Sequence, residues 1–240
     1  MKEFLILQFD APAIAFGGPM VDNYGVIQEH PAVSMIAGLL ANALGLNHKD
    51  ADEIQSLQDS LQVAARRDRQ GEVLVDYQTV DLGQSFLDGT GWTTYGERRL
   101  RAGAAGKDTH IRYRHYRADC FYICALAVRK DCPWSFERIE SALRHPARPL
   151  FLGRKCCLPS LPIFAGRMSA DSLLDALAQY PRLKGRTDPG KLPAWWPAED
   201  PEADSEVFAV TDARDWKNQI HCGRRFIRQG VLNPPEATYE

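Results

Sequence analysis

The sequence lacks the short motifs by which many metal-dependent and nucleotide-dependent enzymes are identified. Its six histidines form no His-Glu-x-x-His pattern, and the chain has no Walker loop, no Gly-x-Ser-x-Gly elbow and no Gly-x-Gly-x-x-Gly after a predicted strand. Hydrolysis by a catalytic triad, nucleotide cofactors and a metal centre therefore have no support in the sequence. We expect no cofactor and no bound metal.

Zinc-type cysteine pairs and long apolar runs are also missing. The six cysteines include no two Cys-x-x-Cys pairs, which indicates reduced and mostly buried thiols. No run approaches the ~18 apolar residues of a membrane span. Residues 1–5 lack the basic and then apolar pattern of a signal peptide. These absences predict a cytoplasmic protein with no membrane partner.

Charge is unevenly distributed along a chain that is nearly neutral as a whole. The 240 residues have a net charge of −2 and 45% hydrophobic content, as in a folded globular protein. The first sixty residues hold 2 basic and 8 acidic groups, whereas residues 97–117 hold seven basic groups and two acidic ones. Six of those seven are arginines, which bind phosphate through two hydrogen bonds and also stack on bases. This pattern favours RNA as the partner.

Hydrophobic patterning predicts an α+β fold. Apolar periodicity and turn residues predict strands over 4–9, 63–67, 73–77, 118–128 and 149–152, and helices over 34–44, 50–61 and 135–145. We interpret 63–67 and 73–77 as strands joined through the turn 68–71. The tail predicts a helix over 169–180 and strands near 207–210 and 225–228.

The order of these elements is that of a ferredoxin-like (RRM-like) βαββαβ unit. We expect this palm to comprise residues 1–80 and 118–165. Residues 81–117 are rich in glycine and arginine and poor in core residues, which predicts an inserted β-hairpin or arm. Residues 166–240 then form a smaller β-rich part packed on the palm.

Several basic and histidine residues allow more than one interpretation. His110 or His115 is a candidate base for metal-free RNA cleavage, or a group that only stacks on or hydrogen-bonds RNA. The whole arm is alternatively a solvated loop with surplus arginines. Gly153-Arg154-Lys155 fits a phosphate clamp, since glycine lets the backbone approach a phosphate, but it also fits an ordinary surface pair.

Several sequence blocks together resemble a known family. Gln8-Phe9-Asp10-Ala11-Pro12 with Phe16-Gly17, then His30-Pro31-x-x-Ser34 and 38–45, resemble the CasD subunits of type I-E CRISPR Cascade complexes. The blocks 76–80, 112–119 and 149–160 follow in the same order as in that family. The resemblance covers most of residues 1–160, whereas the tail matches loosely through Arg225-Phe226-x-Arg228.

This resemblance implies a RAMP protein in which a palm and an arginine-rich thumb bind RNA. It implies a non-catalytic subunit that binds and caps the 5′ handle of CRISPR RNA (crRNA) in antiviral defence. The implied partners are crRNA, a backbone subunit and a large subunit, with target DNA an indirect partner through the complex. The alternative is a metal-independent crRNA-processing endoribonuclease, which is the role of the related type I-C subunit.

Two departures from the family pattern favour a binder over a nuclease. Val33 stands where the family commonly has lysine, and Gln78 stands where it commonly has histidine. We also expect the backbone N–H groups at the helix start near Ser34 to bind phosphate. The residues expected to contact RNA are Phe16, Gly17, Ser34, Arg98, Arg99, Arg101, Lys107, Arg112, Arg114, Tyr116, Arg154 and Lys155.

Overall fold

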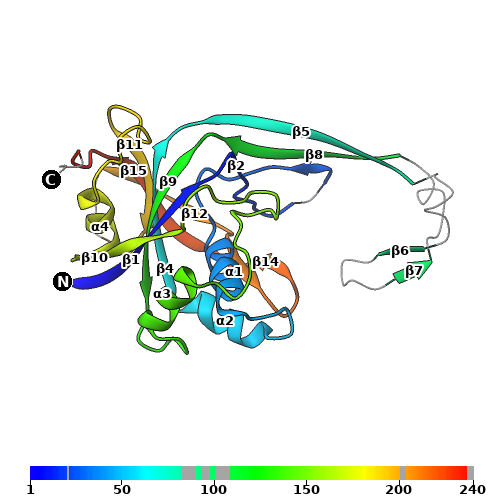
Figure 1. The fold of residues 1–240 in the computed structure, drawn as a ribbon, viewed down its shortest axis with the longest axis horizontal. Coiled ribbons are helices and arrows are strands. Elements are labelled where there is room, and N and C mark those ends of the chain that lie inside the picture. Colours follow the sequence, from blue (N-terminus) through cyan, green and yellow to red (C-terminus); the bar gives the residue numbers. More distant parts are fainter. Residues whose placement is uncertain (21, 83–89, 93–97, 101–108, 201–203, 237–240) are drawn as a thin grey trace.

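The computed structural model describes residues 1–20, 22–82, 90–92, 98–100, 109–200 and 204–236 (Figure 1). The helices in this part of the chain are α1 (Val33–Leu44), α2 (Ala51–Asp59), α3 (Phe136–Arg144) and α4 (Leu173–Gln179). The strands are β1 (Lys2–Asp10), β2 (Ala13–Ile14), β3 (Tyr24–Gly25), β4 (Leu61–Arg69), β5 (Glu72–Asp81), β6 (Thr90–Trp92), β7 (Arg98–Leu100), β8 (Thr109–Ala118), β9 (Phe121–Val128), β10 (Phe164–Ala170), β11 (Leu192–Pro197), β12 (Ser205–Val210), β13 (Ala213–Asp215), β14 (Ile220–Cys222) and β15 (Arg225–Leu232).

A seven-stranded sheet with the order β10-β1-β9-β4-β11-β15-β12 forms the body of the protein. Its first four strands, together with α1 and α3, follow the chain order strand, helix, strand, strand, helix, strand. All of the neighbouring pairs among those four strands are antiparallel. The body is therefore a mixed α/β structure in which strands dominate.

The sheet corrects two sequence predictions about where the palm ends. Residues 149–152 form no strand, and the strand that pairs with β1 is β10. The expected boundary at 165 therefore falls inside a strand. Strands β11, β15 and β12 then continue the same sheet from the edge of β4, so the C-terminal part extends the sheet as well as covering it.

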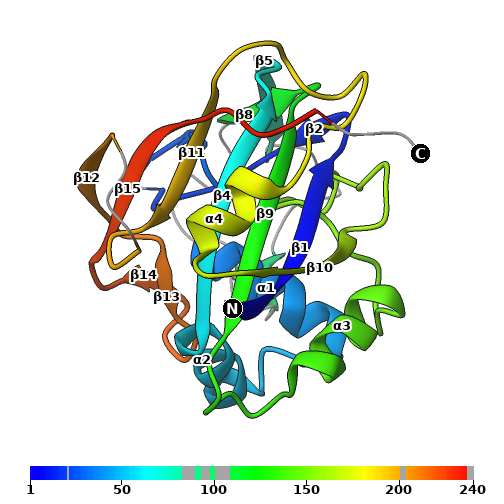
Figure 2. The same cartoon turned by 90° about the vertical axis from the view of Figure 1, so that its left-hand side faces the viewer.

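Helices cover both faces of this sheet (Figure 2). On one face, α1, α2 and α3 enclose a core that includes Leu7, Phe9 and Leu126. On the other face, α4 packs over a second cluster that includes Ile6 and Trp196. Because residues alternate between faces along a strand, neighbours such as Ile6 and Leu7 belong to different cores.

The predicted helices are present, with ends set by local chemistry. Gly45 ends α1 in the left-handed conformation, with φ of 88°, as its position in the sequence predicts. Ser135 and Ser172 cap α3 and α4 by accepting hydrogen bonds from backbone N–H groups within the first turn.

The predicted projection is a long two-stranded ribbon. Strand β5 pairs antiparallel with β8 along its whole length, and the ribbon extends away from the body (Figure 1). We call residues 72–118 the arm. The prediction that residues 63–67 and 73–77 form one hairpin is wrong, because β4 pairs with β9 and β11 while β5 pairs with β8. The arm therefore begins before the expected residue 81.

Glycine is required where the arm leaves the body. Gly71 has a φ of 60°, and a Cβ atom added there would lie 2.1 Å from the carbonyl oxygen of Ala118. On the other strand, Asp119 also adopts a positive φ, of 49°. The two bends lie next to each other at the root of the arm, since Glu72 pairs with Ala118.

Candidate nucleic-acid interface

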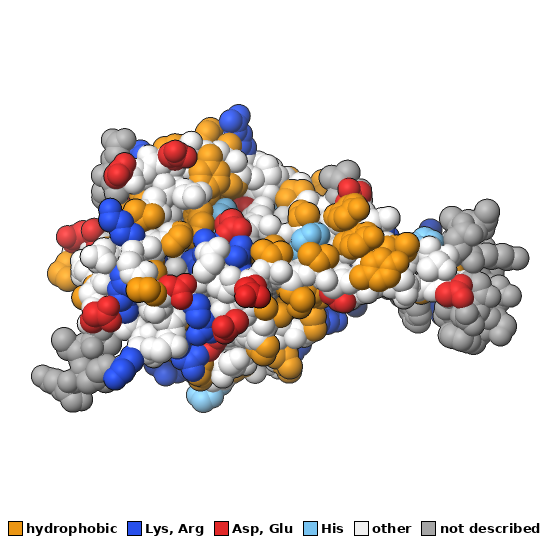
Figure 3. Space-filling view, turned by 90° about the horizontal axis from the view of Figure 1, so that it is seen from above, with side chains coloured by type: hydrophobic (Ala, Val, Ile, Leu, Met, Phe, Trp, Pro, Cys, Tyr) orange, Lys and Arg blue, Asp and Glu red, His pale blue; other side chains and the backbone are white. Residues whose placement is uncertain are grey.

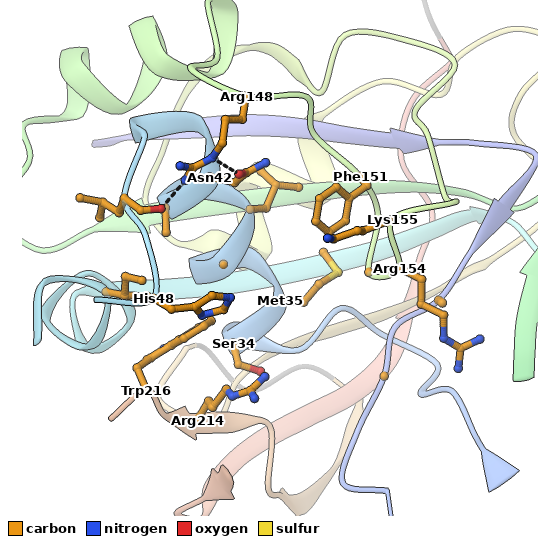
Figure 4. A pocket seen from close by; sticks show the side chains of 18 of the residues that line it. Ser34, Met35, Asn42, His48, Arg148, Phe151, Arg154, Lys155, Arg214 and Trp216 are labelled. Atoms are coloured by element: carbon orange, nitrogen blue, oxygen red, sulfur yellow. Dashed lines mark hydrogen bonds between the residues drawn. The ribbon is translucent and has the colours of Figure 1, made fainter. Parts of the chain in front are cut away.

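A cavity of about 1160 Å³ opens along helix α1. Its walls come from α1, the loop 15–18, the segment 148–158 and the hairpin β13–β14 (Figure 4). Five lining side chains are cationic, and none of the described residues that line the cavity is Asp or Glu. The cations are Lys49, Arg148, Arg154, Lys155 and Arg214. We call this cavity the basic groove.

Apolar side chains lie among these cations. Met35 and Leu39 of α1, Phe151, Leu158 and Trp216 all line the groove. Cationic side chains beside apolar and aromatic ones suit a single-stranded nucleic acid, because its phosphates and its bases need different surfaces.

Arg148 shapes the groove from the end of α1. Its guanidinium donates hydrogen bonds to Asn42 Oδ1 at 2.6 Å, Asn47 Oδ1 at 2.9 Å and the carbonyls of Gly45 and Leu46 (Figure 4). The Arg148 N–H groups thereby satisfy backbone carbonyls at the end of α1, which the helix itself leaves free. Arg148 therefore holds the loop after α1 and adds positive charge to the groove, and no carboxylate of a described residue pairs with it.

Arg154 and Lys155 were predicted as one clamp, but their environments differ. Arg154 Nη1 donates to the carbonyl of His115 at 2.8 Å, and Nη2 donates to the carbonyl of Gly25 at 2.9 Å. Its guanidinium also lies 4.6 Å from the ring centre of Tyr116. Lys155 is exposed and has no ion-pair partner within the described ranges. Arg154 therefore ties the loop to the arm, and Lys155 is available to a phosphate.

Glycine is required at position 153 for backbone packing, and not for the approach of a phosphate that the sequence predicts. Its φ is 93°, and an added Cβ atom would lie 1.8 Å from the carbonyl oxygen of Ala15. The neighbouring Leu152 carbonyl accepts a hydrogen bond from the N–H of Ala15 at 3.1 Å. This close approach joins the first loop to the segment that carries Lys155.

The start of α1 is occupied by a carboxylate of the same chain. The buried Asp212 accepts from the N–H of Val33 through its side chain, at 3.3 Å, and from the N–H of Ser34 through its backbone carbonyl, at 3.1 Å. Arg225 pairs with the same carboxylate. The expectation that these N–H groups bind phosphate is therefore wrong, although Ser34 itself lines the basic groove.

The two first-loop residues differ in their access to a ligand. Phe16 is 3% exposed and packs edge-on against Tyr122 with ring centres 5.0 Å apart. Its ring belongs to the core and does not face a ligand. Gly17 lines the basic groove, and a Cβ atom added there would meet nothing within 4 Å.

Three of the predicted arm residues share one face of β8. Arg112, Arg114 and Tyr116 alternate along the strand, and Tyr116 packs under Arg154 at the groove wall. Arg114 also approaches the groove, since a Cβ atom added at Gly25 would meet both Arg154 Nη2, at 2.8 Å, and Arg114 Cδ, at 3.2 Å. This face therefore continues the basic groove onto the arm.

Two more of the predicted residues, Arg98 and Arg99, are exposed on β7, which pairs with β6 (Figure 1). Arg101 and Lys107 lie outside the described residues. Arg112 donates to Asn23 Oδ1, which joins the arm to the loop before β3.

Sequence reasoning missed the groove residues from the C-terminal hairpin. Arg214 on β13 pairs directly with His221 on β14, and Trp216 follows at the turn. Burial lowers the pKa of Arg214. Burial and then the positive charge of Arg214 lower the pKa of His221. No motif marks these residues, because their proximity to α1 arises only in the folded chain.

Neither candidate base for RNA cleavage, His110 or His115, lines the basic groove. The two histidines are separated by an odd number of positions on β8, so they lie on opposite faces of the ribbon. The described residues also include no group of three or more His, Cys, Asp or Glu side chains that fits a metal ion. None of their helices is long and apolar enough to cross a membrane.

Comparison with known sequences identifies relatives of this chain. Residues 4–228 match the family described as CRISPR-associated protein (Cas_Cas5). The CRISPR system Cascade subunit CasD of Escherichia coli (strain K12) is 28% identical over 189 residues, which are 77% of this chain and 80% of that protein. These matches confirm the family resemblance that the sequence motifs indicate.

Two solved structures share the fold. A chain described as a CRISPR RNA-guided surveillance complex superposes with a TM-score of 0.69 and 21% identity, covering 97% of this chain and 91% of that one. A second, described as a crystal structure of a Cas protein, gives a TM-score of 0.66 and 24% identity over 98% of both chains.

Proposed function

Because this chain belongs to the CRISPR-associated Cas5 family, we propose that it is the non-catalytic subunit of a type I-E Cascade complex that binds and caps the 5′ handle of crRNA. The observation that carries this proposal is the basic groove of about 1160 Å³, whose described lining includes five cationic side chains and no carboxylate. A polyanion is the ligand that such a lining favours.

The architecture supports a RAMP interpretation of the fold. The order β10-β1-β9-β4 with α1 and α3 is that of a ferredoxin-like palm. We retain a division into palm, thumb and C-terminal extension, with the thumb starting at Glu72 and the last palm strand ending at Ala170. The groove is then lined by the palm and the C-terminal extension, and Arg154 in its wall joins it to the thumb through the carbonyl of His115.

On the side of the arm, Lys155 of the groove supplies a cation for the handle, and Arg114 and Arg112 supply two more from the adjoining face of β8. Each phosphate that these side chains neutralise releases counterions from single-stranded RNA. The affinity should therefore fall with salt, with a slope of about 0.7 per phosphate contacted. RNA bases that point away from these cations can contact apolar side chains of the groove, such as Met35 and Phe151.

The arm also presents a surface that suits protein partners. Val73, Val75 and Tyr77 are about half exposed on one face of β5, and Figure 3 shows hydrophobic side chains gathered along the arm. On β3, Tyr24 stacks on Tyr113 of β8 with ring centres 4.8 Å apart. An apolar face beside a basic one fits a subunit that contacts both RNA and neighbouring proteins, here the backbone and large subunits.

The test combines binding and cleavage in one experiment. The purified chain is incubated with repeat-derived RNA that contains the 5′ handle, in EDTA, across a series of salt concentrations. We expect RNA to bind with a salt-dependent affinity and to remain intact. A specific cut at the handle boundary would instead favour the metal-independent endoribonuclease, and binding that does not change with salt would contradict the role of the groove.

Matched variants locate the binding site. Lys155→Gln should weaken binding, whereas Lys130→Gln should not, because Lys130 is an exposed lysine that does not line the groove. Equal effects of the two substitutions would show that the affinity is a property of total charge.

A further inference from the structure

We infer that Arg214 and His221 form a phosphate-binding subsite of the basic groove, which takes one backbone phosphate of single-stranded RNA. This inference rests on the proposed function and extends the interface to the C-terminal hairpin β13–β14, on the wall away from Arg154 and Lys155 (Figure 4).

The first argument is that the positive charge of Arg214 is not balanced by a carboxylate of a described residue. Arg214 is partly buried and forms no ion pair with any described residue. Its Nη2 donates to the carbonyl of Gln219 at 2.9 Å, while its buried Nε has no hydrogen-bond partner. A desolvated cation without a counter-charge is costly, so its presence beside a cavity favours an anionic ligand.

The second argument is that another buried nitrogen without a partner lies next to Arg214. His221 lies directly across the hairpin from Arg214, and its buried Nδ1 lacks a hydrogen-bond partner among the described residues. The carboxylate of Asp212 is already paired with Arg225 and with the start of α1. Arg214 and His221 therefore both line the groove, whose described lining contains no carboxylate, although Asp212 lies close enough to His221 to oppose the lowering of its pKa by burial and by Arg214.

The third argument is that the hairpin is held in position. Gln58 of α2 donates to the carbonyl of Arg214 at 3.0 Å and accepts from its N–H at 3.0 Å. The same Oε1 accepts from Trp216 Nε1 at 3.1 Å. The Arg214 guanidinium lies 5.5 Å from the centre of the Trp216 ring. A preorganised cation loses little freedom when it binds a ligand.

A planar guanidinium and an imidazole suit a phosphate, because arginine donates two parallel hydrogen bonds to its oxygens. The lining also continues to Ser34 and Lys155 within the same cavity. A strand that enters at the arm therefore meets a second cationic wall across α1, and the groove binds successive phosphates on two sides.

The test compares Arg214→Gln with Arg224→Gln in the full-length chain. Arg224 stacks on the exposed Phe226 and does not line the groove, so it is a matched control. Binding of a labelled single-stranded handle RNA is measured by fluorescence polarisation over a salt series. We expect Arg214→Gln to weaken binding by about tenfold, as for one charge-assisted contact. It should also reduce the salt slope by about 0.7.

Unfolding temperature separates a ligand role from a structural one. Arg214→Gln relieves an unpaired, partly buried charge but also loses the hydrogen bond to the Gln219 carbonyl and the contact with Trp216, so the two effects should offset and the unfolding temperature should change little. His221→Gln should also weaken RNA binding without a large fall in the unfolding temperature. A large fall in the unfolding temperature of Arg214→Gln would make the guanidinium structural and overturn the inference, as would an unchanged salt slope or an equal loss in Arg224→Gln.

Two further outcomes distinguish this inference from the proposed function. If the unmodified chain does not bind the RNA, the proposed function fails, whereas RNA binding that is unaffected by Arg214→Gln refutes only the subsite. Inorganic phosphate alone should stabilise the chain far less than the RNA does. Equal stabilisation by phosphate would assign the site to a small anion and overturn its assignment to a strand.

Discussion

Substitution of Arg154 should lower the stability of the fold, whereas substitution of the adjacent Lys155 should lower RNA affinity and leave the stability unchanged. In Arg154→Ala, the carbonyls of His115 and Gly25 lose a charged donor, and the Tyr116 ring loses its cation. Hydrogen bonds to charged groups contribute ~1.5–3 kcal/mol each, and partial exposure places these two at the lower end of that range. A cation–π contact at such a site adds ~0.5–1 kcal/mol. We therefore expect the free energy of unfolding to fall by about 3.5–4 kcal/mol.

In Lys155→Ala, no hydrogen bond or ion pair of the described chain is lost, because the side chain is exposed and makes none. Its free energy of unfolding should stay within ~0.5 kcal/mol of the unmodified value. Its RNA affinity should fall, and its salt slope should decrease by about 0.7.

Urea unfolding followed by circular dichroism measures the free energy of unfolding. RNA titration over a salt series measures the RNA affinity and its salt slope. Arg154→Lys is a useful intermediate, because an ammonium keeps the charge without the fork that reaches two carbonyls. The reasoning is refuted if Arg154→Ala is as stable as the unmodified chain but loses RNA, since the guanidinium would then be a ligand and not a brace.

Three further predictions concern the walls of the groove and the thiols. Asp212→Ala should lower the free energy of unfolding by ~3–5 kcal/mol in a urea titration, because it leaves Arg225 without its buried partner; a change below 1 kcal/mol, roughly, would show that the pair is dispensable. Gly153→Ala should lower the unfolding temperature in calorimetry, because its Cβ atom would lie 1.8 Å from a backbone oxygen, and an unchanged temperature would contradict this packing. Burial raises the pKa of Cys120 to about 12, so at pH 8 it remains a thiol, and iodoacetamide followed by mass spectrometry should find the exposed Cys156 alkylated first. Faster labelling of Cys120 would contradict its burial.

The sequence predicted the elements of the fold better than their pairing. Apolar periodicity located α1, and Gly45 correctly marked its end. Period-two patterns located β4 and β5, but such a pattern does not identify the partner strand, so the bend at Gly71 was interpreted as a hairpin turn. Strand β10 contains glycine and alternates weakly, which is why the pattern placed the partner strand of β1 too early, at residues 149–152.

Only part of the candidate site could be predicted from the sequence, because the sequence shows which residues are charged but not which residues they contact. A run of arginines is visible in any sequence, so the arm could be predicted from charge alone. Whether a given arginine meets a ligand or a carbonyl depends on tertiary contacts, and Arg154 is the example. Arg148 and Arg214 belong to segments with no unusual composition, and only the packing of those segments around α1 brings them into the groove.

The paired bends at Gly71 and Asp119 make the arm a separable part of the molecule. The chain enters and leaves the arm through two adjacent backbone positions, whose left-handed conformations set its direction, while the root of the arm also contacts the body through Tyr116 and Arg117. Lengthening, shortening or exchanging the ribbon beyond Arg112 should therefore leave the seven-stranded sheet and its two cores unchanged. Relatives with arms of other lengths are therefore compatible with one body, and a transplanted ribbon that keeps this double bend should inherit the same orientation.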